Sequence, residues 1–221
     1  MLKPRLQTIY NLISQTKHVV DIGSDHAFLC VSLLKNNVCE LVTNIEINQL
    51  PLLNGWNNVK KHNLETKTNF ILNNGLKDLT LDKPVDYICM SGMGADNIIQ
   101  IISDNKTNQP KYYILQANND VNKLRIFLKD NHYCIEDEKL VFENNRYYEV
   151  IKAKTNCKST LNNTDIHIGP ILKTNDTEDF KKYIQLRYNH LQKIPFNLTS
   201  DLVKEEFITI KEFLNEKKWI S

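Results

Sequence analysis

The sequence predicts an α/β fold in which a mostly parallel sheet, with helices on both faces, ends in an antiparallel edge. Strand-like apolar runs alternate with helical patterns five times between residues 19 and 128, which is typical of a doubly wound sheet. Two extended runs, 134–142 and 147–153, then flank the polar turn 143–146, so a β-hairpin is expected to close the sheet. Beyond residue 169 the apolar residues recur at helical spacing alone, which predicts a C-terminal pair of helices.

The composition is that of a soluble protein with a sizeable core. The chain has 221 residues, of which 41% are apolar, enough for one large domain or for a domain with an appendage. No apolar run approaches the roughly 18 residues of a membrane span, and the N-terminus lacks the apolar region of a signal peptide. We therefore expect a cytoplasmic protein with no membrane partner, and a monomer in solution. The net charge of +2 does not by itself indicate nucleic-acid binding, which needs clustered basic residues.

The cysteines predict neither a disulfide framework nor a metal site. The five are odd in number, widely spaced and without the C-x-x-C pair that zinc sites and redox motifs use. We expect no bound metal, and we interpret all five as buried thiols: Cys30, Cys39, Cys89, Cys134 and Cys157.

The stretch 19–35 organises the rest of the chain. Residues 19–22 form a strand pattern, Gly23 provides the free backbone of a sharp turn, and a helical pattern runs from about 26 to 35. The opening of that helix presents free N–H groups above the strand, which suits a nucleotide-like ligand. In the glycine-rich dinucleotide fingerprint a glycine stands where this chain has Asp25. A pyrophosphate would be repelled by that carboxylate, whereas a sulfonium or an amino group would not.

Two elements flank this unit in the sequence. Residues 5–13 form an amphipathic helix pattern, which either caps the sheet or forms part of a substrate mouth. The second strand, 41–46, ends at Glu46, which lies 23 residues beyond Gly23. A carboxylate about 20 residues after the first turn is placed to accept hydrogen bonds from ribose hydroxyls. The alternative is an ordinary solvated glutamate at a strand end.

The third strand, 68–72, follows a helix pattern over 52–62 and runs into Asn74-Gly75. The Asn74 amide offers a donor and an acceptor to an adenine edge. An ordinary Asn-Gly turn is the alternative.

Strands 85–90 and 112–116 complete the parallel set. The first exits into the segment Ser91-Gly92-Met93-Gly94, where two glycines allow the backbone to approach a ligand closely. A helix over 97–103 follows. The second strand ends just before Asn118, and a further helix pattern runs over 121–128.

The C-terminal part is predicted to be a separate antiparallel, coiled-coil-like helical hairpin. We divide the chain into a domain over 1–155, a polar linker over 156–168 and the hairpin over 169–221. Asn175 and Glu178 resemble a capping pair at the first helix start, and the turn is expected at 195–199. The hairpin is either an RNA-gripping arm or a solvated pair of helices. Its apolar stripes are Phe180, Ile184, Leu191 and Ile194 on one helix, and Val203, Phe207, Ile210 and Leu214 on the other.

Together Asp21-x-Gly23, Glu46, Asn74-Gly75 and the terminal β-hairpin resemble the class I S-adenosylmethionine-dependent methyltransferases, which have a Rossmann-like sheet. Within that class, four further motifs resemble the bacterial family that methylates N1 of the adenosine at position 22 of tRNA. These motifs are Val20-Asp21-Ile22-Gly23-Ser24-Asp25-His26-Ala27, Ser91-Gly92-Met93-Gly94, Leu115-Gln116-x-Asn118 and Tyr148-Glu149. The match covers about residues 5–155, and beyond them only the helical hairpin.

The resemblance implies that the chain is a tRNA methyltransferase with S-adenosyl-L-methionine as methyl donor and tRNA as partner. It implies that Asp21 orients the methionine amino group and that Glu46 holds the ribose. It also implies that Asn74 faces the adenine. Further cofactor contacts are expected from Gly23, Ser24, His26, Gly75, Ser91, Gly92 and Met93.

Two residues are candidates for the chemistry on the base. Asp25 would stabilise the methylated cation, and its alternatives are to hold His26 or to cap the helix. His26 itself would contact the substrate or the methionine carboxylate. Asn118 would contact the substrate base. N1 of adenine carries a lone pair and no proton, so no general base is required before attack and positioning against the sulfonium suffices.

Two other functions remain compatible with the sequence. A small-molecule methyltransferase would use the C-terminal hairpin as a lid or a dimer contact. A non-catalytic RNA-binding module would have lost cofactor binding through its altered glycine loop.

Overall fold

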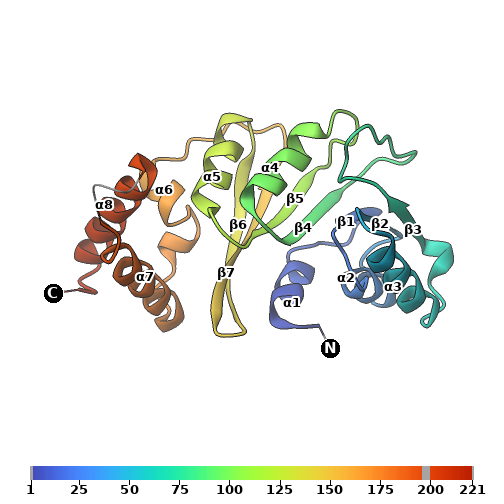
Figure 1. Cartoon of the computed structure of the whole chain (residues 1–221), viewed down its shortest axis with the longest axis horizontal. Helices are drawn as coiled ribbons and strands as arrows, with labels where there is room; N and C mark the ends of the chain where they lie inside the picture. Colours follow the sequence, from blue (N-terminus) through green and yellow to red (C-terminus); the bar gives the residue numbers. More distant parts are fainter. Residues whose placement is uncertain (1, 196–199, 221) are drawn as a thin grey trace. The chain divides into compact units, whose positions relative to one another are not determined.

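The computed structural model describes residues 2–195 and 200–220. The chain divides into two compact units, residues 1–158 and 159–221 (Figure 1). The first unit carries the sheet and the second is helical.

The sheet of the first unit has seven strands in the order β3-β2-β1-β4-β5-β7-β6. Five strands are parallel, and β7 and β6 are antiparallel to their neighbours. The predicted α/β fold with a mostly parallel, Rossmann-like sheet and an antiparallel hairpin is therefore confirmed. The strands are β1 (His18–Ile22), β2 (Leu41–Glu46), β3 (Thr68–Leu72), β4 (Tyr87–Met93), β5 (Tyr112–Ala117), β6 (Cys134–Glu143) and β7 (Arg146–Lys154).

Helices cover both faces of this sheet (Figure 1). Val19 packs in a core with the first three helices, whereas the next residue, Val20, packs in a second core with α4 and α5. Successive strand residues point to opposite faces, so β1 is buried on both sides. The helices are α1 (Pro4–Asn11), α2 (Phe28–Lys35), α3 (Gln49–Lys60), the short 3-10 helix η1 (Glu65–Lys67), α4 (Ala95–Asp104) and α5 (Val121–Asp130).

Two boundaries near the predicted site differ from the sequence expectation. Strand β4 continues through Ser91 and Gly92 to Met93, and its register with β5 shifts at this point, so the expected exit loop is a β-bulge. Helix α2 begins at Phe28 rather than near residue 26. Asp25 and Ala27 have φ values of 37° and 52°, and this left-handed backbone cannot belong to an α-helix.

The β6–β7 hairpin turns through Asn144 and Asn145, whose φ values are 51° and 60°. Two central residues with positive φ are typical of the tight hairpin turn that matches strand twist. A buried ionic cluster attaches the hairpin to α5. Arg125 donates hydrogen bonds of 2.9 and 2.7 Å to Glu138 and contacts Glu149.

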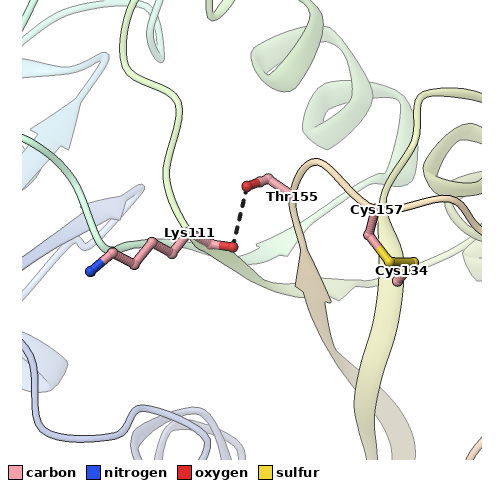
Figure 2. Close-up of a disulfide and its surroundings, with 4 residues drawn as sticks. All are labelled: Lys111, Cys134, Thr155 and Cys157. Carbon is pink, nitrogen blue, oxygen red and sulfur yellow. Dashed lines mark hydrogen bonds between the residues drawn. A yellow bond between two sulfur atoms is a disulfide. The ribbon is translucent and has the colours of Figure 1, made fainter.

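Cys134 and Cys157 form a disulfide, with their Cα atoms 5.5 Å apart (Figure 2). The expectation of buried thiols is wrong for this pair and correct for Cys30, Cys39 and Cys89. Antiparallel pairing places Cys134 opposite Lys154, which brings the start of β6 beside the segment that follows β7. The Thr155 hydroxyl also hydrogen-bonds the carbonyl of Lys111, at 3.3 Å, and this contact holds the end of β7 to the start of β5 (Figure 2).

The second unit contains α6 (Asn163–His167), the 3-10 helix η2 (Leu172–Thr174), α7 (Glu178–Leu191) and α8 (Asp201–Glu216). Helix α6 lies within the segment expected as a linker. The N-cap of α7 is Thr177, whose hydroxyl accepts from the Phe180 N–H. Asn175 is not the cap residue, because its side chain accepts from the Thr177 N–H instead.

The α7 and α8 helices pack together through the predicted apolar stripes. Phe180, Ile184 and Leu191 are buried, as are Ile210 and Leu214. Residues 196–199 of the expected turn lie outside the described residues. Over the two described ranges, no helix has both the length and the apolar character of a membrane span.

Candidate cofactor and substrate site

A cavity of about 370 Å³ lies at the carboxyl ends of strands β1, β2, β3 and β4. This is where ligands bind in open α/β sheets, and the volume is within the usual range of small-molecule sites. Five of the predicted cofactor residues line it: Gly23, Glu46, Asn74, Gly75 and Met93.

Gly23 forms the cavity wall where β1 ends. Its φ is +77°, a conformation that favours glycine. A Cβ atom at this position would lie 3.1 Å from the Met93 methyl carbon. A side chain here would therefore require the flexible end of Met93 to move.

Glu46, the last residue of β2, presents a carboxylate to the cavity. One of its oxygens accepts the Asp25 N–H, which ties the first loop to the second strand. Burial raises the pKa of Glu46, and the Asp25 N–H opposes that rise. The group can accept further hydrogen bonds from a ligand.

Asp21 lies in β1 and is 7% exposed. Burial, with a smaller contribution from the charge of Glu46, raises the pKa of Asp21 to about 7. A cationic ligand group beside Asp21 would favour the ionised carboxylate and bring the pKa down. The pair Asp21 and Glu46 therefore makes this end of the sheet suited to a positively charged ligand.

The turn after β3 places Asn74 at the cavity. Gly75 has a φ of +57°, and a Cβ atom here would come within 2.8 Å of Ile101. The side chain of Asn73 donates to the carbonyls of Gly75 and Lys77, both at 3.0 Å. Asn73 thus holds the turn and leaves the exposed Asn74 beside the cavity. The Asn-Gly pair predicted the turn from the sequence, but it did not indicate that Asn73 holds the turn while Asn74 faces the cavity.

The first loop places Asp25 beside His26, with 3.4 Å between Asp25 Oδ2 and His26 Nε2. Both side chains are about half exposed, at 61% and 49%. The N-cap residue of α2 is Ala27, so Asp25 does not cap the helix. Of its expected alternatives, the contact with His26 is the one present.

A hydrogen-bond network joins the ends of β4 and β5 next to the cavity. The Gly92 N–H donates to Gln116 Oε1 at 3.0 Å, and the Gly92 carbonyl accepts from Asn118 Nδ2 at 2.7 Å. Gln116 Nε2 donates to Asn118 Oδ1 at 3.1 Å. Arg5 of α1 donates to Gln116 Oε1 at 3.0 Å, so α1 is hydrogen-bonded to the end of β5. No local motif in the sequence marks Arg5.

The structure thus brings most of the predicted residues to one edge of the sheet. The Asn118 N–H donates to the Met93 carbonyl at 2.9 Å, which places Asn118 next to the cavity wall. Among the described residues, five predicted cofactor contacts lie outside the cavity lining: Asp21, Ser24, His26, Ser91 and Gly92. The same described part of the chain contains no group of three or more His, Cys, Asp or Glu side chains that could hold a metal ion.

The sheet order, the antiparallel terminal hairpin and the acidic cavity at the carboxyl edge define a Rossmann-like methyltransferase. The model of the family described as tRNA (adenine(22)-N(1))-methyltransferase matches residues 19–218. This chain belongs to that family.

Individual relatives agree with this assignment. A Mycoplasma pneumoniae protein is 32% identical over 214 residues, which are 93% of this chain and 94% of that protein. The structure is similar to that of a Streptococcus pneumoniae protein solved with S-adenosyl-L-methionine, with a TM-score of 0.87, 27% identity and coverage of 97% of this chain and 100% of the other. It is also similar to Mycoplasma capricolum TrmK solved with S-adenosyl-homocysteine, with a TM-score of 0.82, 29% identity and coverage of 99% and 98%. The resemblance drawn from the sequence is confirmed, and with it the tRNA methyltransferase activity.

Proposed function

We propose that this chain transfers the methyl group of S-adenosyl-L-methionine to N1 of adenosine 22 in tRNA, with the cofactor in the cavity at the ends of β1 to β4. The observation that carries this placement is Glu46, a strand-end carboxylate that faces the cavity between Gly23 and Gly75. An acid at the end of the second strand is the group that binds the ribose in Rossmann-like sites.

Each cofactor group finds a suitable partner in this arrangement. Glu46 accepts hydrogen bonds from the ribose hydroxyls, and Asn74 pairs with the adenine edge. Asp21 accepts from the methionine ammonium, because a buried carboxylate gains most from a cationic partner. Gly23 and Ser24 pass beneath the cofactor. His26, in the first loop, and Ser91 and Gly92, at the bulge of β4, flank its methionine end, while Met93 forms the wall.

The chain contributes to the methyl transfer by aligning adenine N1 with the methyl group of the cofactor. The bond between adenine N1 and the methyl carbon forms as the bond between that carbon and sulfur breaks, and no proton moves beforehand. Holding the two reactants in line supplies much of the rate. The product base is cationic, and the half-exposed Asp25 is the carboxylate of the first loop that offsets that charge.

The second unit serves as the tRNA-binding arm in this proposal. Phosphate contacts position a nucleic acid without reading its sequence, and α7 and α8 offer Lys and Arg side chains for that role. We expect the protein to act as a cytoplasmic monomer.

The test uses the full-length chain, labelled S-adenosyl-L-methionine and two tRNA transcripts that differ only at position 22. Label at N1 of adenosine 22, and its loss when this adenosine is replaced by guanosine, is the expected result. Label at another nucleotide, or equal label in both transcripts, would overturn the assignment of the target base.

A further inference from the structure

The bulge at Gly92 turns one residue of β4 out of the strand ladder. Register with β5 shifts between Ser91 and Met93, and Gly92 has a φ of +81°. Its N–H and its carbonyl bind two side chains at the end of β5, Gln116 and Asn118, rather than β5 backbone. Bulges next to active sites commonly redirect side chains.

The orientation of the Gln116 and Asn118 amides follows from their partners, each of which can act only as a donor or only as an acceptor. The Gly92 N–H and Arg5 Nη1 are both donors, and both lie 3.0 Å from Gln116 Oε1. The nitrogen of Gln116 is therefore the atom that faces Asn118 Oδ1. The Gly92 carbonyl can only accept, so it fixes Asn118 Nδ2 independently.

Asn118 keeps half of its hydrogen-bonding capacity free for a ligand in this arrangement. An amide can donate two hydrogen bonds and accept two, and the contacts with Gln116 and Gly92 use one donor and one acceptor. Asn118 is solvent-exposed and adjoins the cavity wall through Met93. The remaining donor and acceptor match the N7 and N6 edge of adenine, the usual partner of an asparagine amide. Binding at that edge leaves the N1 lone pair free to attack the methyl group.

We propose that Asn118 reads the N6 and N7 edge of the target adenine, and that Arg5 is a positioning residue that holds the Asn118 amide in the required orientation through Gln116. The proposal rests on the function proposed above. A guanine in the same place would present an oxygen to Asn118 Oδ1, so the fixed amide disfavours it.

Arg5 is suited to this role because two strands other than β5 hold it in place. Its backbone N–H donates to Glu143 Oε2 of β6 at 3.0 Å, and its guanidinium lies 5.1 Å from the centre of the Tyr148 ring of β7. Gln116 is completely buried, so it has no water to replace a lost partner. Loss of the Arg5 donor would remove one of the two donors that hold Gln116 Oε1, and so weaken the orientation of the Gln116 amide.

The experiment compares methylation of tRNA carrying adenosine or 7-deazaadenosine at position 22. The second base keeps N1 and the N6 amine and lacks only the N7 acceptor. The measured quantity is the ratio of kcat/KM for the two tRNAs. We expect this ratio to be about tenfold larger in the wild-type enzyme than in Asn118→Ala, the change that about 1.4 kcal/mol produces. Comparing the two enzymes cancels the intrinsic difference in N1 reactivity.

Gln116→Glu and Arg5→Met test the positioning step. A carboxylate cannot donate to Asn118, and methionine retains the stem of Arg5 without its donors. Both variants should lower the ratio towards that of Asn118→Ala while their affinity for S-adenosylhomocysteine stays unchanged. Arg5→Lys, which keeps a donor at this position, should retain part of the wild-type ratio. Asn119→Ala, the same change one residue further on, is the matched control and should keep the wild-type ratio.

A ratio that is equal in wild type and Asn118→Ala would overturn the reading of N7. Lower rates in Gln116→Glu and Arg5→Met with a wild-type ratio would show that these residues serve only the fold. Failure of the wild-type enzyme to methylate adenosine 22 at all would instead refute the proposed function, so the two failures are distinguishable.

Discussion

Replacement of Asp21 by asparagine is expected to stabilise the ligand-free protein and to weaken cofactor binding. The pKa of Asp21 is raised from 3.8 to about 7 by burial and by Glu46. A carboxyl whose pKa is raised in the folded state stabilises the fold while it is protonated. That stability is lost as the pH rises from about 4 through about 7. Asparagine carries no charge at any pH and avoids the loss.

The magnitude follows from the difference between the two pKa values. Three pKa units at 1.36 kcal/mol each correspond to at most about 4 kcal/mol above pH 7. The free energy of unfolding of Asp21→Asn should therefore exceed that of the wild type at pH 8, and the difference should shrink at pH 5. Binding of S-adenosylmethionine should weaken, because a hydrogen bond to a charged group contributes about 1.5–3 kcal/mol.

Chemical denaturation of the ligand-free proteins at pH 5 and pH 8 measures the first effect, and calorimetry with S-adenosylhomocysteine measures the second. Asp82→Asn, which changes an exposed loop carboxylate, is the matched control and should shift neither. A stability difference between wild type and Asp21→Asn that is the same at both pH values would refute the account of the buried charge. Unchanged cofactor affinity would show that Asp21 does not bind the ammonium group of the cofactor.

Three other changes have defined outcomes. Glu46→Ala should weaken S-adenosylmethionine binding by about 1.5–3 kcal/mol, because the contacts with the ribose are lost. Unchanged affinity by calorimetry would show that Glu46 is an ordinary solvated glutamate at a strand end. Truncation after residue 158, the boundary of the first unit, should leave cofactor binding intact and sharply lower activity on tRNA, and full activity in the truncated protein would remove the RNA role of the second unit. Reduction of the Cys134–Cys157 disulfide, whose cysteines are 23 residues apart, should lower the free energy of unfolding by up to about 3 kcal/mol. The Cys134→Ser variant should not respond to reductant, and a wild-type protein equally indifferent to it would contradict this prediction.

The sequence predicted the strands of the sheet well because each one is a buried apolar run that ends at recognisable turn residues. Five parallel strands and the hairpin lie within a few residues of their predicted positions. Glu46, Asn74 and Gly75 were also found from the sequence, since Glu46 ends a strand and the other two lie in the turn that follows one. Local signals of this kind predict both the fold class and the edge of the sheet, at the carboxyl ends of the strands, where a ligand binds.

The remaining features depend on contacts between distant parts of the chain. At the bulge, the peptide groups of Gly92 bind two distant side chains, Gln116 near the end of β5 and Asn118 just beyond it. Arg5 reaches this network from a helix that lies 111 residues away in sequence from Gln116. The disulfide likewise depends on strand pairing. The positive φ of Asp25 could not be predicted from the sequence, because an aspartate does not indicate a left-handed backbone as a glycine does.

The most direct test of the site is a crystal structure of this chain with S-adenosylhomocysteine. We expect the ribose hydroxyls on the Glu46 carboxylate, the amino group on Asp21 and the adenine beside Asn74. Ligand bound elsewhere, or bound in this cavity with its ribose away from Glu46, would contradict this placement.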